Sequence, residues 1–491
     1  MIQTKDNSTP CRKPLRSFLA TSALALGMAG CAQIPALDAL AIFKPATSYE
    51  TRQSFAAANA DWPTERWWDE YADPQLDRLI EEALQASPDM LAAAARLRSA
   101  EALAGVAGST LSPQVSANMS ASSQRLSYNY LTPQAMTPEG WNDVGRATLD
   151  VSWDLDFWGR NRAGVAAAKS QVEAVAAETA QARLNLAAAI AAGYAELAHH
   201  FSEWDTAERS VQIRQKTLAL FEERYINGLE TQGTVSSAKS LLAAAEGELL
   251  AAEEAIALQR TRLAALLGTG PDRGQAIARP AVNLAKDFGL PHQLAADLLG
   301  RRPDIVAARW MAEAQNQRID QKKAEFYPNV NLLAFIGVQA LGLDMLTRSG
   351  SAIGSVGPSI SLPIFTAGRL QGELRGTVAA YEESIANYNR TVTRALQEVA
   401  STGLSQQVLT KRMAKAKEAV AAATEAHRVA RNRYEGDLAN YLEVLYAENV
   451  LLQAQRALTF LQSRAFALDV AMKRALGGGY RAATNTLQRN S

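Results

Sequence analysis

Apolar and polar residues alternate strictly around position 150. The apolar positions are Ala147, Leu149, Val151, Trp153, Leu155 and Phe157, and the polar positions between them include Asp150, Asp154 and Asp156. A period of two predicts a β-strand with one apolar face and one hydrophilic face. The pattern returns in a second segment, where Val356, Ile360, Leu362 and Ile364 are the apolar positions.

Two further alternating runs begin at Pro113 and Pro328. The chain is therefore predicted to contain four strands of about 10 to 13 residues, the length that a tilted membrane strand requires. A soluble β-sandwich would explain the alternation as well. However, the acidic row on Asp150, Asp154 and Asp156 needs water on its face, which a wet lumen supplies. Aromatic Trp153, Phe157 and Trp158 gather toward one end of a strand, as at a membrane interface.

Proline is absent between Pro138 and Pro271 and again after Pro363. These windows are rich in Ala, Leu, Glu, Gln, Lys and Arg, and so predict long helices. A continuous helix from Arg160 to Arg224 would be about 100 Å long. Turn residues then predict that each long helix returns as a partner of about 40 residues. The alternative interpretation is a soluble two-stranded coiled coil.

The same landmarks occur twice along the chain. Ser87-Pro88-Asp89 matches Arg302-Pro303-Asp304 with a displacement of 215 residues, and Gly159-Arg160 matches Gly368-Arg369 with a displacement of 209. Arg224-Tyr225 likewise matches Arg433-Tyr434. Each copy is therefore expected to contain a helix, a β-hairpin and a long helical hairpin, joined in that order.

These landmarks define the expected domain organisation. It comprises a signal peptide at 1–30, a lipidated segment with a first helix at 31–85, repeat one at 86–270, a linker at 271–300, repeat two at 301–478 and a flexible tail at 479–491. The β-hairpins are predicted at about 113–157 and 328–365, and the helical turns near 225–230 and 434–439.

The N-terminus has the pattern of a targeting segment. Basic residues precede an apolar run from Phe18 to Met28, which is too short to span a bilayer and ends in small residues before Cys31. Gly27-Met28-Ala29-Gly30-Cys31 resembles a bacterial lipobox, which implies cleavage before Cys31 and acylation of that residue. Ala32 after the Cys favours sorting to the outer membrane by the same resemblance. The alternative is an ordinary secretory signal with an incidental Cys.

Composition argues against nucleic-acid binding and against a metal site. Lys and Arg total 50, as do Asp and Glu, so no basic footprint for nucleic acid exists. The four His include the neighbours His199 and His200, which point to different sides of a helix and so cannot share a metal. Gly477-Gly478-Gly479 is interpreted as a tail linker rather than a phosphate loop. Neither a catalytic motif nor a cofactor site is predicted.

No run of 18 or more apolar residues follows Cys31, so any membrane crossing must use the strands. Four strands cannot close on themselves, and an open edge in hydrocarbon leaves backbone groups unpaired. The chain is therefore expected to form an oligomer. Two copies would supply eight strands and a filled lumen, whereas three would supply twelve and leave room for a channel.

The order of these motifs resembles the TolC-like outer membrane factor family, in its lipoprotein branch similar to NodT and OprM. The motifs are Trp67-Trp68, Tyr71-Ala72-Asp73-Pro74, Glu81-Glu82-Ala83-Leu84, Ser87-Pro88-Asp89 and Arg301-Arg302-Pro303-Asp304-Ile305. The resemblance implies a mainly helical homotrimer, with a 12-stranded outer-membrane β-barrel continued by a long periplasmic α-helical barrel.

The same resemblance implies a passive efflux channel for small molecules, embedded in outer-membrane lipid. Its expected partners are a periplasmic adaptor protein and an inner-membrane transporter of the RND type. Two alternatives stay open at this point. One is an outer-membrane channel for type I protein secretion, and the other is a structural lipoprotein that spaces the periplasm without a pore.

The resemblance also identifies a periplasmic tip that narrows the tube, meets the adaptor and is opened. The matching residues are Tyr225, Gly228 and Leu229 in the first copy and Tyr434, Leu438, Glu443 and Val444 in the second. A ring of Glu443 from three chains would disfavour anions at the entrance. The alternative is that Glu443 only solvates a helix end.

Overall fold

The computed structural model describes residues 34–37, 39–51, 53–55, 60–129, 133–281, 290–291, 294–436 and 438–482. Cys31, the predicted signal peptide, most of 282–293 and residues 483–491 lie outside the described residues. The chain divides into two compact units. Unit 1 is built mainly from Glu101–Gln171 and Met311–Ser384, and unit 2 from Ile42–Ala100, Val172–Trp310 and residues 385–482. Each unit therefore contains pieces of both repeats.

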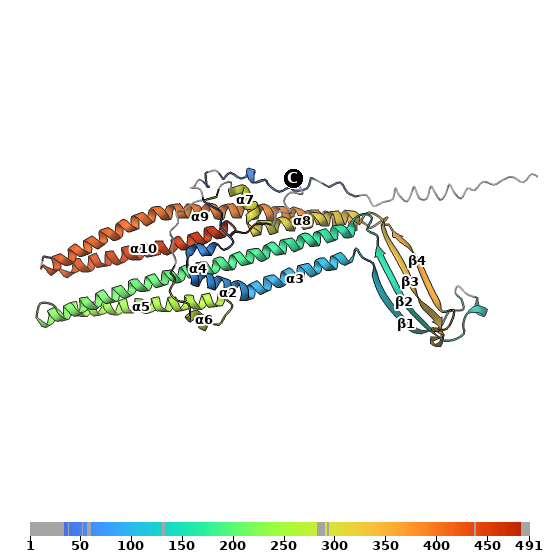
Figure 1. The fold of residues 1–491 in the computed structure, drawn as a ribbon, viewed down its shortest axis with the longest axis horizontal. Helices are drawn as coiled ribbons and strands as arrows, with labels where there is room; N and C mark the ends of the chain where they lie inside the picture. The colour runs from blue at the N-terminus through green and yellow to red at the C-terminus, as the bar shows by residue number, and fades with distance from the viewer. Residues whose placement is uncertain are drawn as a thin grey trace, which may run out of the picture. The chain divides into compact units, whose positions relative to one another are not determined.

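Unit 1 contains a single four-stranded sheet, which confirms the predicted number of strands. The strands are β1 (Gln114–Gln124), β2 (Asn142–Asp154), β3 (Asn329–Leu341) and β4 (Ala352–Ser361). They lie in the order β1-β2-β3-β4 and every neighbouring pair is antiparallel, as the arrows in Figure 1 show. A sandwich would need a second sheet, and the described part of the chain has only this one.

The register of the sheet sorts its side chains by polarity. Val115 is paired with Val151, Val151 with Ala334, and Ala334 with Val356, so an apolar row crosses all four strands. The neighbouring row contains Ser116, Asp150, Phe335 and Ser355, whose side chains point to the opposite face. In the single chain the apolar row is open to solvent, with Val115 62% and Val356 74% exposed.

The polar face is organised by hydrogen bonds between strands. Asn118 on β1 donates to Oδ2 of Asp150 at 2.9 Å, and the Thr148 hydroxyl donates to the same oxygen at 2.8 Å. Phe335 interrupts this face, and the guanidinium of Arg146 lies 5.1 Å from its ring centroid. The predicted hydrophilic face is thus present, but it also contains the apolar residues Val144, Leu333, Phe335, Leu341 and Ile353.

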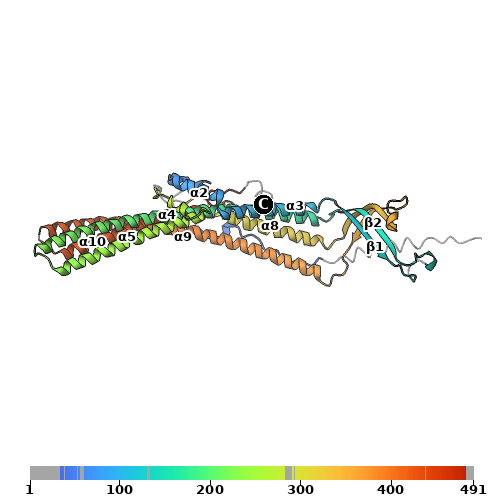
Figure 2. The same ribbon diagram turned by 90° about the horizontal axis from the view of Figure 1, so that it is seen from below.

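The helices repeat with the spacing that the landmarks predicted. Their bounds are α2 (Pro74–Ala86), α3 (Pro88–Ser109), α4 (Arg160–Ile226), α5 (Gln232–Leu266), α6 (Asp272–Gln275), α7 (Leu294–Arg301), α8 (Pro303–Ala324), α9 (Arg369–Glu435) and α10 (Tyr441–Ala475). The long helices α4 and α9 have 67 residues each, and their partners α5 and α10 have 35 each. Figure 1 shows α4 with α5 and α9 with α10 as two long helical hairpins, and Figure 2 shows them along the same axis from a second side. The predicted pair of long hairpins is confirmed.

The main core of unit 2 explains the Trp-Trp and Asp-Pro motifs. Trp67, Trp68 and Tyr71 belong to a short 3-10 helix and are buried against α2, α4, α5 and α10. Asp73 then begins α2, because its Oδ1 accepts from the Gln75 amide at 2.9 Å. Its Oδ2 accepts from the Tyr194 hydroxyl at 2.8 Å, so one carboxylate joins α2 to α4.

The Arg-Pro-Asp motif of repeat two connects three helices. Arg302 is buried just before α8 and donates through Nη1 to the Ala475 carbonyl at 3.1 Å, at the C-terminus of α10. The same nitrogen donates to Glu398 on α9 at 2.9 Å. Asp304 accepts from Nε at 3.0 Å and from Nη2 at 2.6 Å. The guanidinium is therefore paired on all sides, as a buried cation requires.

The interpretation of Gly477-Gly478-Gly479 as a tail linker is wrong. All three residues have positive φ angles, of 89°, 56° and 80°, and lie against other segments of unit 2. A Cβ on Gly477 would come within 2.0 Å of the Arg301 carbonyl oxygen, and one on Gly479 within 2.2 Å of the Thr64 backbone. Tyr480 and Ala482 also pack here, beside Val306 and Ala307. The glycines allow close approach of backbones rather than free movement.

Within the described residues, none of the helices is both long enough and apolar enough to cross a membrane. The same residues contain no group of three or more His, Cys, Asp or Glu side chains that could hold a metal ion. His199 and His200 instead each approach the carboxylate of Glu203.

Replacing Gly479 with Ala should lower the free energy of unfolding by at least about 1 kcal/mol, because the backbone is left-handed and the methyl group meets Thr64. Thermal unfolding followed by circular dichroism in detergent measures the change. Gly270→Ala is the matched control, since nothing lies within 4 Å of that site and its φ is not positive. Equal stabilities for the two variants would contradict this assignment.

Candidate functional site at the tips of the helical hairpins

The turn between α4 and α5 is closed by backbone hydrogen bonds that need a glycine. Gly228 has φ 74°, and the next amide, of Leu229, donates back to the Arg224 carbonyl at 2.8 Å. Helix α5 then begins at Thr231, whose side chain accepts from the Thr234 amide at 3.3 Å. Both ends of the turn thus have their free backbone groups satisfied.

The turn between α9 and α10 repeats this geometry. The Leu438 amide donates to the Arg433 carbonyl at 2.8 Å, and Asn440 begins α10 by accepting from the Glu443 amide at 3.3 Å. The pairs Leu229 and Leu438, and Thr231 and Asn440, are each 209 residues apart. The internal repeat therefore extends to individual hydrogen bonds.

The structure brings together only some of the predicted tip residues. Tyr434 lies with Arg224, whose guanidinium is 5.5 Å from its ring centroid, and with Tyr441, whose ring is 5.5 Å away. Val444 is buried in the first turns of α10. By contrast, Tyr225, Leu229 and Leu438 are exposed and make no part of this cluster.

Glu443 lies at the surface in the first turn of α10. Its carboxylate accepts from Nη1 of Arg433 at 3.2 Å, with about half of each side chain exposed. An exposed pair of this kind contributes about 0 to 1 kcal/mol to stability. The equivalent position in repeat one is Thr234, which has no charge.

Sequence reasoning did not identify the residues that join the two hairpins near their tips. The Phe221 ring on α4 packs edge-on against Tyr441 on α10, with centroids 4.4 Å apart. The Tyr441 hydroxyl donates to Oγ1 of Thr217 at 2.9 Å, and burial raises the pKa of this hydroxyl to about 12. Nothing in the local pattern marks these residues, because Tyr441 corresponds to Gln232 and Phe221 to Ala430 in the other repeat.

A buried ion pair also connects α4 with α10. Nε of Arg214 lies 3.5 Å from Oε1 of Glu448, and both side chains are less than a tenth exposed. Arg214 Nη2 donates to Asn449 at 2.9 Å, whereas its Nη1 has no hydrogen-bond partner among the described residues. Burial raises the pKa of Glu448, and Arg214 opposes that shift. Losing either partner would leave a buried charge unpaired, which costs about 3–5 kcal/mol.

A groove of about 480 Å³ lies between the two hairpins at this level. Its lining combines hydroxyl groups and aromatic rings with the Arg214 side chain and with the aliphatic side chains of Leu241, Leu442 and Leu445. The hydroxyl groups belong to Thr217, Thr231, Thr234, Ser237 and Tyr441, and the aromatic rings to Phe221 and Tyr441. The groove offers hydrogen-bond donors and acceptors without an arrangement of acid, base and nucleophile that would support catalysis.

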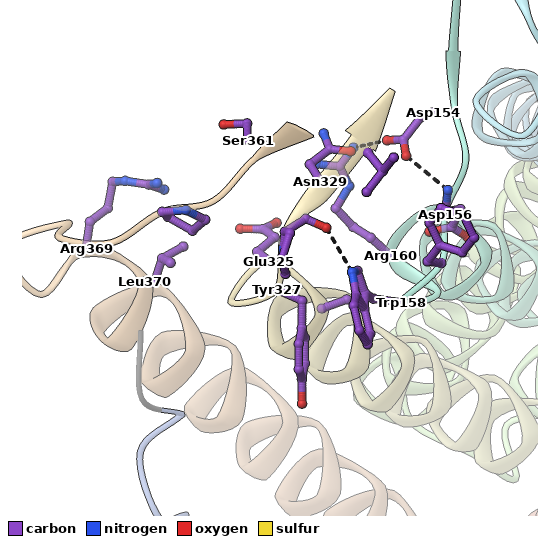
Figure 3. A pocket seen from close by; sticks show the side chains of 15 residues that line it. Asp154, Asp156, Trp158, Arg160, Glu325, Tyr327, Asn329, Ser361, Arg369 and Leu370 are labelled. Atoms are coloured by element: carbon purple, nitrogen blue, oxygen red, sulfur yellow. Dashed lines mark hydrogen bonds and ion pairs between the residues drawn. The ribbon is translucent and has the colours of Figure 1, made fainter. Parts of the chain in front are cut away.

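A second cavity, of about 290 Å³, lies in unit 1 where strands continue into helices (Figure 3). Asp156 begins α4 by accepting from the amides of Asn161 and Arg162, each at 2.9 Å. Asp154 forms an ion pair with Arg160. The Trp158 ring stacks on Tyr327 with centroids 4.7 Å apart. These contacts fix the strand-to-helix junction, so we assign the cavity a structural role.

Replacing Glu448 with Gln should change how stability depends on pH. Because the pKa of Glu448 is raised in the folded state, folded protein holds this proton more readily than unfolded protein does. Protonation of Glu448 therefore stabilises the folded state fully below about pH 4.5, and this stabilisation is lost as the pH rises through the raised pKa. The Gln variant has no carboxyl group to ionise, so its stability does not fall in this way as the pH rises. Its free energy of unfolding relative to the wild type should therefore increase from pH 4.5 toward neutrality.

Denaturant unfolding in detergent at several pH values tests this prediction. Glu425→Gln is the control, because Glu425 is exposed and Arg428 lowers the pKa of its carboxyl. A constant difference between Glu448→Gln and the wild type at every pH would contradict it.

Comparison with known proteins places both repeats in one family. The family model described as outer membrane efflux protein matches residues 79–269 and 294–478. The fusaric acid resistance protein FusA of Burkholderia cepacia is 40% identical over 72% of this chain and 68% of its own length. The multidrug resistance outer membrane protein MdtP of Shigella flexneri is 33% identical over 87% of this chain and 88% of its own length.

A solved structure agrees with these matches. The outer membrane protein VceC of Vibrio cholerae is 48% identical, and the superposition covers 86% of this chain and 100% of VceC with a TM-score of 0.81. The outer-membrane channel OprN also matches, at 27% identity over 91% of this chain and 98% of its own, with a TM-score of 0.78. The repeated strand pair and long helical hairpin, together with these matches, show that the chain belongs to the outer membrane efflux protein family.

Proposed function

We propose that this chain is the outer-membrane channel subunit of a tripartite efflux system and forms a passive conduit for small molecules. One observation carries the proposal, namely a sheet with a largely apolar face whose strands lead into the long helices α4 and α9. The names of FusA and MdtP, as proteins of fusaric acid and multidrug resistance, support export of toxic compounds.

The sheet edges support assembly into a homotrimer. Among the residues that the structure describes, strands β1 and β4 each have a partner on one side only, and every residue of β1 is exposed. In hydrocarbon the unpaired backbone groups of such an edge cost several kcal/mol each. Pairing β4 of one copy with β1 of the next would remove both edges, and three copies would supply twelve strands around a lumen.

The hairpin tips are the proposed site of gating and of contact with a periplasmic adaptor. The adaptor would in turn join the channel to an inner-membrane transporter, for which the RND type is proposed. The seven tip residues predicted from the sequence belong to this proposal. Cys31, which lies outside the described residues, is proposed as an acylated anchor that adds about 0.8 kcal/mol per buried CH₂.

The channel is expected to conduct ions when the purified protein is added to a planar lipid bilayer. The same material from outer membranes should migrate as a trimer before heating and as a monomer after heating. A periplasmic spacer without a pore would show neither property. A monomeric, non-conducting protein would therefore contradict the proposed function, whereas conductance with a secreted polypeptide as cargo would favour the type I secretion channel.

Replacing Glu443 with Ala should reduce cation selectivity, because three carboxylates at the entrance favour counter-ions. Arg433 partly neutralises Glu443 in each copy, so Arg433→Ala should shift the selectivity in the opposite direction. Reversal potentials in a KCl gradient measure both shifts. Glu425→Ala, ten residues before the turn, is the control and should leave the potential unchanged. Identical potentials for all three variants would leave Glu443 as a helix-end residue only.

A further inference from the structure

Three of the apolar side chains on the hydrophilic face of the sheet lie together. Leu333 and Phe335 follow each other on this face of β3, and Ile353 on β4 is paired with Gly337, the next position of the same face. Leu333 is 46% exposed, and Phe335 and Ile353 are half-buried. The three side chains therefore form one accessible apolar surface, which we call the Phe335 patch.

Two glycines border the Phe335 patch, and they differ in what explains them. At Gly337 a Cβ would come within 2.1 Å of the Ala147 carbonyl oxygen, so the close approach of β2 accounts for this glycine. Gly357, the partner of Leu333, has no such constraint, because a Cβ there would meet no atom within 4 Å. A glycine within a strand often marks a place where a ligand approaches closely. Open space therefore lies beside the patch at Gly357.

A cation without a carboxylate partner lies at the other side of the patch. Arg146 on β2 is paired with Gln339, and its guanidinium extends past Gly337 to lie 5.1 Å from the centroid of the Phe335 ring. Within the described residues Arg146 makes one side-chain hydrogen bond, from Nη1 to Gln339 at 3.3 Å, and no ion pair. A guanidinium has five N–H donors in a fork that matches a carboxylate. Most of these donors are therefore available to a ligand.

The carboxylate nearest in the register is already satisfied by other partners. Asp150 is paired with Phe335 across β2 and β3. Its Oδ2 accepts from Asn118 on β1 at 2.9 Å and from Thr148 at 2.8 Å. These donors hold the carboxylate toward β1, on the side of β2 that is remote from the patch. The charge at the patch that lacks a counter-ion is therefore positive.

We propose that Arg146 and the Phe335 patch form a binding site for amphipathic aromatic carboxylates on the lumenal face of the channel. The guanidinium would donate to the carboxylate, while Phe335, Leu333 and Ile353 would contact the ring and an alkyl substituent. The inference rests on the proposed function, because the face opposite the lipid then lines the conduit. A weak site of this kind would favour entry of such compounds and still release them.

Binding of 4-butylbenzoate at pH 7 tests the site. The ligand is added to the full-length trimer in detergent, and saturation-transfer difference NMR gives its dissociation constant, with protein-free detergent as the background. Arg146→Gln should raise this constant at least about tenfold, because charge-assisted hydrogen bonds are lost. Phe335→Ser should have a similar effect. Arg348→Gln is the matched control, since it removes an exposed cation from the β3–β4 connection, where Arg348 is paired with Asp344.

Uncharged and oppositely charged analogues separate the two parts of the site. The amide 4-butylbenzamide should bind the wild type about tenfold more weakly than the carboxylate does, and Arg146→Gln should not change its affinity. Tighter binding of the amine 4-butylbenzylamine than of the carboxylate would overturn the assignment of Arg146 as the anchor.

Ser355→Asp provides a second variant that removes no contact of the patch. Ser355 is exposed and lies directly opposite Phe335, so an added carboxylate there should repel the ligand. The dissociation constant of 4-butylbenzoate should rise several-fold, whereas that of the amide should stay the same. This variant keeps the test decisive if Phe335→Ser fails to assemble.

The outcomes separate this inference from the proposed function. A conducting wild-type trimer whose affinity for 4-butylbenzoate is unchanged by Arg146→Gln and by Ser355→Asp would overturn the site alone. Equal loss of affinity in Arg348→Gln would also overturn it, because the effect would then follow net charge and not the patch. A wild-type protein that is monomeric and does not conduct would overturn the proposed function.

Discussion

The backbone groups along the free edges of β1 and β4 constrain the whole molecule. Within the described residues the sheet has four strands, one apolar face and no further strand to complete it. Lipid solvates the apolar face favourably. The unpaired backbone groups at the edges are unfavourable there, because hydrocarbon offers no hydrogen-bond partner. The sheet of one chain is thus suited to be one part of a larger sheet formed by several copies, and the long helices continue from the same strands.

The internal repeat includes the long helices as well as the strands. Equal lengths of α4 and α9, and of α5 and α10, give two hairpins whose turns share the same hydrogen bonds. The two repeats differ at the residues through which their hairpins contact each other. Arg214, Phe221 and Tyr441 join the hairpins within one chain, while their counterparts Ala423, Ala430 and Gln232 have small or neutral side chains. The two hairpins therefore have nearly the same backbone structure but different side chains at the positions where they contact each other.

Much of the fold could be predicted because it depends on periodicity and on proline. Alternation around Val151 marks a strand in any context, and the absence of Pro after Pro363 permits a long helix. The glycine triplet was misinterpreted because Gly477 signals either freedom or close backbone contact, and only tertiary structure distinguishes them. The Arg214 and Glu448 pair could not be predicted, since an isolated Glu in a helix is ordinarily solvated. The role of Cys31 stays a prediction.

The apolar row through Val115, Val151, Ala334 and Val356 has a consequence for biogenesis. Surface of this kind is an aggregation hazard in water, above all beside an unpaired strand edge. A subunit that completed its sheet while still surrounded by water would attract other exposed strands indiscriminately. Closure of the sheet, association of the subunits and insertion into lipid should therefore be coupled. A newly exported chain would need a chaperone until these steps occur.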